Sequence, residues 1–566
     1  MEQIRVGTAG GKGNDSAPGR GRWGRWAAAL VLTLCLLPFV NKALNIDDPL
    51  FVRSAQRITQ APADFYGLEI NWDSRPRPLK EIFQNPPLTS YWLALWASVA
   101  GWSEISLHAA MLVWAVALGL GMHALASLFC TRPALAAVSG ALTPVVLVSA
   151  SMLMCDVMML ALWVWAAAFW VRGVRGGRLG LMLLAALLTA LCGLSKYFGI
   201  SLVPLLTAYS LLHRRGLDPR LLVLALPLAA WAAYDVWTAG IYGHGLLIEA
   251  MDYADSEGHG GLRSFFVGLA FTGGCLLPML AAGPCVWGRR GVVAGFVLTA
   301  VAALVILGEG SFGNFPQVYG EARMSAGFAV QAGLCITAGV HVLAMALVQA
   351  SRERDADTAF LVLWVVGVVL FASQVNWSVN GRSLLPLAPA AAVLLVRGAE
   401  RRGSACFRPA AVSLYLCLAL ALSLSSLWAE YRHAESARWA AQEFARRLAD
   451  NKDDVRFQGH WGFQHYMEAE GFVPLDQSLP AEPGWIVLVP ENNTNVVVDT
   501  AIYKLEVLLT VPAASWVTLV NVRMGAGFHA EMFGPLPLVF GRMPLENYFL
   551  FRVVAPAAGA GPPGAS

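Results

Sequence analysis

Residues 26–51 read WAAALVLTLCLLPFVNKALNIDDPLF, an apolar run that is soon followed by two adjacent acids, Asp47 and Asp48. The apolar part is close to the length of about 20 residues that crosses a bilayer. Pro49 comes next, and proline is typical of the first turn of a helix. Charged groups beside a bilayer are costly and tend to mark function. The acidic pair could therefore orient a hydroxyl group, bind a metal, or only cap a helix at the membrane surface.

The composition of the chain excludes an ordinary soluble enzyme. Of its 566 residues, 57% are hydrophobic and only 14% are charged, and the mean hydropathy is +0.56. We therefore predict a polytopic α-helical membrane protein, because apolar runs of spanning length recur about thirteen times between Trp26 and Leu427. After the first span, which ends near Leu44, we expect spans near 104–129, 134–154, 157–171, 179–195, 198–212, 220–239, 265–287, 291–308, 326–350, 358–376, 383–397 and 408–428.

Basic residues are divided unevenly between the two sides of these spans, and such residues in short loops stay in the cytoplasm. The N-terminal segment shares one side with the loop arginines Arg172, Arg175, Arg178, Arg214, Arg215, Arg220, Arg289, Arg290, Arg352, Arg354, Arg397, Arg401 and Arg402. The other side collects Asp47, Asp48, Asp156, Lys196, Asp235, Glu249, Asp252, Asp255, Glu309, Glu321, Arg323 and Arg382. We expect a cytoplasmic N-terminus in the inner or plasma membrane, and chemistry at the extracytoplasmic surface.

The chain divides into four expected regions. Residues 1–22 are polar and glycine-rich and are expected to be disordered, as are residues 556–566. Residues 23–430 form the membrane domain, with a structured first extracytoplasmic loop over 45–88, in which Leu50, Phe51, Ala55 and Ile58 recur at helical spacing. Residues 431–555 form a small extracytoplasmic α/β or α+β domain. Its expected elements are a helix over Glu435–Asp450 and strands over Val455–Phe457, Trp485–Val489, Trp516–Val522 and Tyr548–Val554.

Five short motifs fall on the extracytoplasmic side in order along the chain. They are Asp47-Asp48, Gln84-Asn85-Pro86-Pro87-Leu88, Met154-Cys155-Asp156-Val157-Met158-Met159, Gly193-Leu194-Ser195-Lys196-Tyr197 and Arg382-Ser383-Leu384-Leu385-Pro386. Together they resemble the protein O-mannosyltransferase and aminoarabinose transferase family of polytopic GT-C glycosyltransferases, over about the first 400 residues. The resemblance implies an enzyme that takes a sugar from a polyprenyl phosphate in the bilayer. The acceptor would be a lipid, a glycan or a protein hydroxyl group, and no nucleic-acid partner is expected.

The resemblance also implies a role for each motif residue. It implies that Asp47, Asp48 and Asp156 are the catalytic residues. Asp47 takes the place of the aspartate that serves as the family's base, Asp48 stands where a glutamate is usual, and the counterpart of Asp156 lies near the base. A leaving phosphate needs cations and an acceptor hydroxyl needs a base. The donor phosphate would accordingly be bound by Lys196, Arg382 and Asn85. The element Gln84-Asn85-Pro86 departs from the acidic-Lys-Pro element of aminoarabinose transferases, and Leu50 stands where a basic residue often follows the acids.

A divalent metal ion is a further prediction, with carboxylate and imidazole ligands supplied by the loop over 240–264. Its candidate ligands are Asp252, Asp255 and His259, although an acidic loop is more often only solvated. The aromatic stretch Gly459–Tyr466 in the C-terminal domain is more simply explained as core packing than as a sugar-binding surface.

Each functional interpretation has a simpler alternative. The two adjacent acids would serve only as helix caps, Asp156 would lie in a polar turn, and Lys196 and Arg382 would only snorkel to the interface. For the whole chain, the alternatives are a transporter or flippase of lipid-linked sugars and a non-catalytic envelope assembly subunit. A transporter places polar groups along a path at the bilayer midplane, and this sequence has few there.

Overall fold

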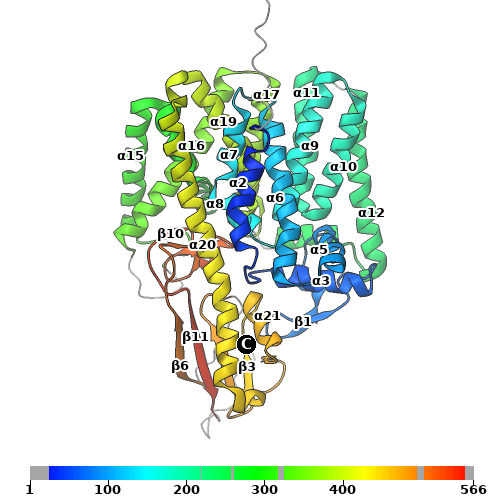
Figure 1. The fold of residues 1–566 in the computed structure, drawn as a ribbon, viewed down its shortest axis with the longest axis vertical. Coiled ribbons are helices and arrows are strands. Elements are labelled where there is room, and N and C mark those ends of the chain that lie inside the picture. Colours follow the sequence, from blue (N-terminus) through cyan, green and yellow to red (C-terminus); the bar gives the residue numbers. More distant parts are fainter. Residues whose placement is uncertain (1–23, 217, 257–259, 317–323, 494–501, 555–566) are drawn as a thin grey trace, which may run out of the picture.

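The computed structural model describes residues 24–216, 218–256, 260–316, 324–493 and 502–554. A large bundle of helices forms one part of the protein, and a smaller unit with a β-sheet lies below one end of the bundle (Figure 1). The last bundle helix extends into the smaller unit and joins the two. The predicted class, a polytopic helical membrane protein with a C-terminal mixed-sheet domain, is confirmed.

Seven helical segments of the described chain are long and apolar enough to cross a membrane, or eight with a bent pair. The seven are α6 (Glu104–Ala126), α9 (Asp156–Gly176), η3 with α12 (Pro219–Leu224, Ala225–Tyr242), η4 with α15 (Leu277–Ala282, Gly283–Glu309), α16 (Ala326–Arg352), α17 with η6 (Ala356–Leu370, Phe371–Val375) and α20 (Pro409–Arg447). Shorter bundle helices are α2 (Ala27–Leu36), α5 (Leu88–Ala100), α10 (Leu179–Ser195), α11 (Leu202–Arg214), α14 (Leu262–Cys275) and α19 (Leu387–Arg402). The expected total of about thirteen spans stays a prediction.

Two features of the bundle differ from the sequence prediction. The span expected over 134–154 is broken into α7 (Pro133–Ala141) and α8 (Pro144–Ala150), which meet at an angle of 66°. Pro144 begins α8 and has no backbone N–H to continue the α7 hydrogen-bond pattern. The apolar helix α5 was not expected, because its 13 residues are fewer than a span requires.

The first loop is structured, as predicted. Helix α3 (Asp48–Gln60) buries its expected face, and the hairpin β1–β2 (Glu69–Asn71, Pro76–Pro78) and the short helix α4 (Leu79–Ile82) follow it. The expected apolar positions Leu50, Phe51, Ala55 and Ile58 are all buried. Helical spacing of apolar residues thus located a helix that lies at the end of the bundle (Figure 1).

The C-terminal domain begins inside α20, which runs unbroken through Tyr431 and includes most of the helix expected over Glu435–Asp450. Its five-stranded sheet has the order β4-β3-β5-β11-β6, with β3 parallel to β4 and β5, and β11 antiparallel to β5 and β6. The strands are β3 (Val455–Phe457), β4 (Val473–Pro474), β5 (Ile486–Pro490), β6 (Tyr503–Val511) and β11 (Glu546–Val553). The strand expected over Trp516–Val522 is instead two short strands, β7 (Val517–Thr518) and β8 (Val520–Asn521), paired with β10 (Val539–Phe540) and β9 (Ala526–Gly527).

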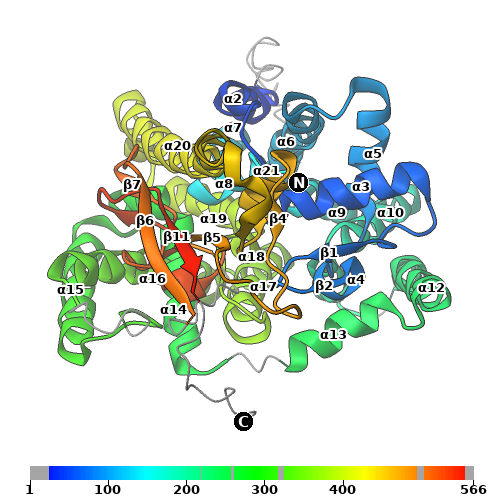
Figure 2. The same ribbon diagram turned by 90° about the horizontal axis from the view of Figure 1, so that it is seen from below.

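The C-terminal domain packs directly against the first loop. Helix α21 (Trp461–Ala469) lies beside β1 and the start of α3 in both ribbon views (Figures 1 and 2). The hydroxyl group of Tyr466 accepts a hydrogen bond of 2.8 Å from the backbone N–H of Leu44, and the rings of Trp72 and His460 stack 4.6 Å apart. The domain therefore covers the end of the bundle where the predicted site lies.

Candidate active site

Asp47 and Arg382 face one another at this end of the bundle. Asp47 precedes α3, and Arg382 lies in α18 (Gly381–Leu384), between α17 and α19. Arg382 Nη1 donates a hydrogen bond of 3.3 Å to Asp47 Oδ2. The carboxylate of Asp47 makes no capping hydrogen bond to α3, although it occupies the N-cap position. The geometry therefore favours an interaction with a cation over the helix-cap alternative.

Asp156 and Lys196 form a second ion pair, 2.6 Å apart. Asp156 is the first residue of α9, where the positive end of the helix dipole faces its carboxylate. Arg382 belongs to the same group of charges. Burial lowers the pKa of the Arg382 guanidinium, but Asp47 and Asp156 outweigh this effect and raise it. The two carboxylates and two cations thus form one cluster.

Two buried polar atoms of this cluster have no hydrogen-bond partner among the described residues. They are Oδ2 of Asp156 and Nε of Arg382. Buried polar atoms in folded proteins are nearly always hydrogen-bonded, so an orphan of this kind calls for an explanation. A bound ligand that carries both donors and acceptors would provide one.

Asn85 joins the cluster from the segment that closes the first loop. Its Oδ1 atom accepts a weak hydrogen bond of 3.5 Å from Cys155 Sγ, next to Asp156. Its backbone carbonyl group accepts a hydrogen bond from the hydroxyl group of Tyr66. Nearby, the hydroxyl groups of Tyr197 and Tyr234 lie 3.3 Å apart. A border of tyrosines therefore lies beside the charged cluster, and sequence reasoning did not single it out.

Asp48 lies beside Asp47 but points away from Arg382 into the protein. Its side chain is fully buried, and its carboxylate accepts hydrogen bonds from the backbone N–H groups of Asn45, at 3.1 Å, and Leu153, at 2.8 Å. Burial raises the pKa of Asp48 to about 6, although Lys42 and the two N–H groups lower it. This geometry favours an anchoring role for Asp48, which joins the first loop to the segment before α9.

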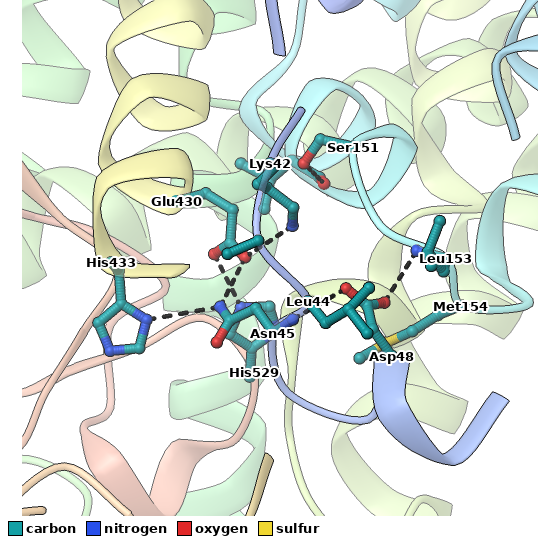
Figure 3. Close-up of polar contacts among 12 residues, drawn as sticks. Lys42, Leu44, Asn45, Asp48, Ser151, Leu153, Met154, Glu430, His433 and His529 are labelled. Carbon is teal, nitrogen blue, oxygen red and sulfur yellow. Dashed lines mark hydrogen bonds and ion pairs between the residues drawn. The ribbon is translucent and has the colours of Figure 1, made fainter. Parts of the chain in front are cut away.

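A second polar cluster lies next to the turn that carries Asp47, and sequence reasoning did not predict it. Lys42, Asn45 and His529 surround the carboxylate of Glu430, which projects from α20 (Figure 3). The one available signal was a lone acid at the end of the last apolar run. Sequence periodicity does not reveal the partners of such an acid, because they are distant in the chain.

The predicted metal ligands do not form a recognisable site in the described part of the chain. Asp252 is exposed on α13 (Leu246–Ser256), while the side chain of Asp255 and the whole of His259 lie outside the described residues. Among the residues that are described, no group of three or more histidine, cysteine, aspartate or glutamate side chains is arranged to hold a metal ion. Metal binding therefore stays a prediction.

The aromatic stretch of the C-terminal domain is core, as expected. Trp461, Phe463 and Tyr466 are buried, and Phe463 packs against Tyr548 of β11 with ring centroids 5.2 Å apart. His460 is buried as well, which lowers its pKa to about 4. These side chains hold the domain together.

Comparison with known proteins bears on the motifs in this cluster. Residues 84–237 match the sequence family described as dolichyl-phosphate-mannose-protein mannosyltransferase. The predicted family resemblance is confirmed. The matched segment of this mannosyltransferase family begins just before α5 and ends within α12, and it includes Asn85, Asp156 and Lys196. Asp47 and Arg382 lie outside it, so their correspondence with family residues rests on the sequence motifs alone.

Several solved structures have partial similarity to this chain. ArnT from Cupriavidus metallidurans in the apo state is 17% identical, with a TM-score of 0.40, over 82% of this chain and 92% of that one. The same protein bound to undecaprenyl phosphate has the same identity and coverage and a TM-score of 0.41. The mycobacterial arabinofuranosyltransferase AftD is 14% identical, with a TM-score of 0.40, over 95% of this chain and 40% of that one. No curated protein sequence matches this chain significantly.

Proposed function

We propose that this chain is an integral-membrane glycosyltransferase that moves a sugar from a polyprenyl-phosphate donor to an extracytoplasmic acceptor. The observation that carries the proposal is the convergence of Asp47, Asp156, Lys196 and Arg382 into one cluster of alternating charge at one end of the bundle. The mannosyltransferase family match over 84–237 supports the same reaction class. The acceptor is a lipid, a glycan or a protein hydroxyl group.

Asp47 is the proposed catalytic base. Its side chain is 26% exposed, so an acceptor hydroxyl group can approach it, whereas Asp48 beside it is fully buried. The hydroxyl proton passes to Asp47 as the oxygen attacks the anomeric carbon of the sugar. The bond from that carbon to the phosphate oxygen then breaks, and the electron pair leaves with the polyprenyl phosphate. Positioned bases of this kind contribute roughly 10²- to 10⁴-fold in rate.

Lys196 and Arg382 are the proposed ligands of the donor phosphate, with Asn85 beside them. Fixed cations stabilise a leaving phosphate by charge-assisted hydrogen bonds, which are strong where water is largely excluded. Both side chains are partly buried, 21% exposed for Lys196 and 15% for Arg382. The Nε of Arg382 has no hydrogen-bond partner in the described part of the chain, which gives the guanidinium a donor for a phosphate oxygen.

The contact of Arg382 with Asp47 couples donor binding to the base. Without a donor, the guanidinium donates a hydrogen bond to Oδ2 of the carboxylate and occupies that oxygen. A phosphate that draws the guanidinium away leaves this oxygen free to accept the proton of the acceptor hydroxyl group. In this scheme the base becomes effective once the leaving group is bound.

The proposal is tested with purified protein in nanodiscs and a panel of polyprenyl-phosphate sugars. Transfer is measured as release of polyprenyl phosphate, and mass spectrometry of glycolipids and glycoproteins from a deletion strain identifies the missing sugar and its acceptor. Loss of a discrete sugar together with release of the carrier by the pure protein supports the proposal. A deletion strain with unchanged surface glycans, and a pure protein that binds none of the donors, would overturn it. Metal dependence is checked in the same assay after dialysis against EDTA.

A further inference from the structure

The buried carboxylate of Glu430, on α20, is bonded to groups from two other parts of the chain. Its Oε1 atom accepts hydrogen bonds from Lys42 Nζ at 3.2 Å and from Asn45 Nδ2 at 2.8 Å. Its Oε2 atom lies 3.1 Å from His529 Nε2, which donates to it. Asn45 Nδ2 also lies 3.4 Å from His433 Nδ1 (Figure 3). The glutamate and Lys42 are both 0% exposed, so this is an internal ionic network.

Stability alone is a weak explanation for such a network. Removing two charges from water costs several kcal/mol per ion, and apolar side chains of the same volume often stabilise a fold equally well or better. The proposed reaction uses none of these groups directly. The network does fix geometry, because its members come from the turn after α2, from α20 and from the segment between β9 and η9 (Glu531–Phe533).

One end of the network holds the turn that carries Asp47. Asn45 accepts a hydrogen bond of 3.1 Å at its backbone carbonyl from the N–H of Asp48, which closes a tight turn. Within that turn Ile46 has a φ of 48°. A β-branched residue is strained in this region, and such a conformation persists only where its surroundings hold it. Asp47 is the next residue, so this strained turn sets the direction of its carboxylate.

The other end of the network holds the segment that carries Arg382. The carbonyl group of Phe528 accepts a hydrogen bond of 2.8 Å from the N–H of Gly381, and the N–H of Glu531 donates one of 2.9 Å to Val379. Any side chain larger than that of Gly381 would meet the Phe528 ring, since an added Cβ atom would lie 2.8 Å from it. The segment 528–531 therefore contacts both Glu430, through His529, and the neighbours of Arg382.

We propose that the C-terminal domain positions Asp47, the proposed catalytic base. Its segment 528–531 contacts the neighbours of Arg382 directly, and it contacts the Ile46 turn through the Lys42–Glu430–His529 network. These contacts fix the turn and the Gly381–Arg382 segment relative to one another, so that Asp47 lies within hydrogen-bond distance of Arg382. Lys42, Asn45, Glu430 and His529 are positioning residues and contact no reacting atom. The inference rests on the proposed function, and it assigns to the C-terminal domain a part in catalysis at the membrane surface.

The test uses two double variants of the full chain. Lys42→Met/Glu430→Met removes both charges and also the acceptor of Asn45, whereas Lys42→Met/Glu430→Gln removes the charges and keeps an amide oxygen for Asn45. Both are expected to fold, because neither removes only one partner of the Lys42–Glu430 pair, and the melting temperature of each is measured alongside. The Met/Met variant should lose roughly tenfold to 10²-fold in kcat. Its KM for the donor should change little, because the backbone hydrogen bonds from segment 528–531 to Val379 and Gly381, beside Arg382, remain. The Met/Gln variant should recover most of that loss.

Hydrogen exchange gives a readout that is independent of catalysis. Peptides that cover residues 43–50 should exchange about tenfold faster in the Met/Met variant, since a net hydrogen bond to a charged group is worth at least that factor. The control pair Lys452→Met/Glu443→Met makes the same changes far from the network. If the Met/Met variant does not fold, His529→Gln, which keeps a nitrogen donor, is compared with His529→Ala in the same way.

The outcomes separate this inference from the proposed function. Wild-type kcat and unchanged exchange in the Met/Met variant would overturn the positioning role. Equal losses in the Met/Met and Met/Gln variants would also overturn it, because the Asn45 contact would then not matter. Asp47→Asn is assayed alongside. Normal transfer by that variant would instead refute the catalytic assignment, while the exchange data would still report on the turn.

Discussion

Lys196 Nζ lies 2.6 Å from Asp156 Oδ1, yet the lysine side chain is 21% exposed and the aspartate only 1%. The cation therefore reaches toward the surface while its counter-charge stays inside, at the N-terminus of α9. In this position the ammonium group can bind an incoming anion without releasing the aspartate. The aspartate in turn depends on the lysine, because a buried carboxylate without a partner is strongly destabilising.

The first prediction follows from this dependence. Lys196→Met should destabilise the protein by at most about 3–5 kcal/mol, the usual cost of breaking a buried ion pair, because Arg382 still lies near Asp156. Lys196→Met/Asp156→Asn should restore most of that stability but not donor binding, since the phosphate ligand is still absent. Thermal melting and donor affinity are measured for both variants, with Lys80→Met as the matched lysine control. Wild-type donor affinity in the double variant would place the phosphate site elsewhere.

Arg382→Ala should weaken donor use while leaving the protein folded. Charge-assisted hydrogen bonds contribute about 1.5–3 kcal/mol, so we expect KM for the donor to rise roughly tenfold or more. Arg77→Ala, which removes a first-loop arginine that pairs with Asp73 and Glu81, is the control. Arg382→Lys should recover only part of the loss, because lysine keeps the charge but not the planar fork of donors. Unchanged KM values in both variants at position 382 would contradict the assignment.

The C-terminal domain carries a pH-sensitive carboxyl group of its own. Glu546 is buried, which raises its pKa from 4.5 to about 8, although backbone N–H groups of Asn492, Asn547 and Glu491 lower it. Because the folded-state pKa is raised, its contribution to stability is complete below pH 4.5 and is lost as the pH rises through about 8. Glu546→Gln mimics the protonated acid, so the stability of this variant should not fall as the pH rises through this range.

The measurement is the melting temperature of wild type and Glu546→Gln across this range. Between pH 5 and 8 the variant should gain at least about 1.4 kcal/mol relative to the wild type, the equivalent of one pKa unit. Glu506→Gln is the control, because Glu506 is exposed on β6 and pairs with Arg552. If the melting temperatures of wild type and Glu546→Gln change with pH in parallel, ionisation of Glu546 does not destabilise the fold and the prediction is wrong.

The orientation of the chain is a separate prediction. The start of α2 lies high in the bundle and the C-terminal domain lies below it (Figure 1), and the basic loops predict a cytoplasmic N-terminus. An alkaline phosphatase fused after Val553 should therefore be active outside the cytoplasm, while a fusion after Arg214 should be inactive. The reverse pattern would move the proposed site to the cytoplasmic side.

The sequence predicted those parts of the fold that depend on local pattern. The buried face of α3 followed from the spacing of Leu50, Phe51, Ala55 and Ile58. The strand β6 was missed because it lies at the sheet edge and has five exposed residues in a row, so it lacks the alternation of a half-buried strand. The helix α5 was missed because it is too short for a span.

The same limit applies to the candidate site. Asp47, Asp156, Lys196 and Arg382 were named from short motifs, and the fold brings them into one cluster. The network around Glu430 was not predictable, because 388 positions separate Glu430 from Lys42 and no local pattern joins them. Short motifs identify the residues proposed to contact a ligand. The residues that position those motifs are distant in the sequence, so they are identified only from the folded structure.

The last prediction concerns Asp47→Asn, which replaces one carboxylate oxygen with an amide nitrogen. The change should hardly alter stability, because the Asp47 side chain makes no capping hydrogen bond and asparagine can still accept one from Arg382. It removes the group that takes the acceptor proton, so kcat should fall roughly 10²- to 10⁴-fold. Donor affinity should remain or rise, since Arg382 is no longer held by a charged partner.

The measurement compares donor binding and transfer by the Asp47→Asn variant in nanodiscs. Asp64→Asn is the matched control, because Asp64 also lies in the first loop and pairs with an arginine, Arg57, at 2.5 Å. A variant that melts normally and binds the donor, yet fails to transfer the sugar, separates chemistry from folding and from substrate binding. Near-normal transfer with unchanged melting would reduce Asp47 to a structural partner of Arg382, because the base would then have to be a different group.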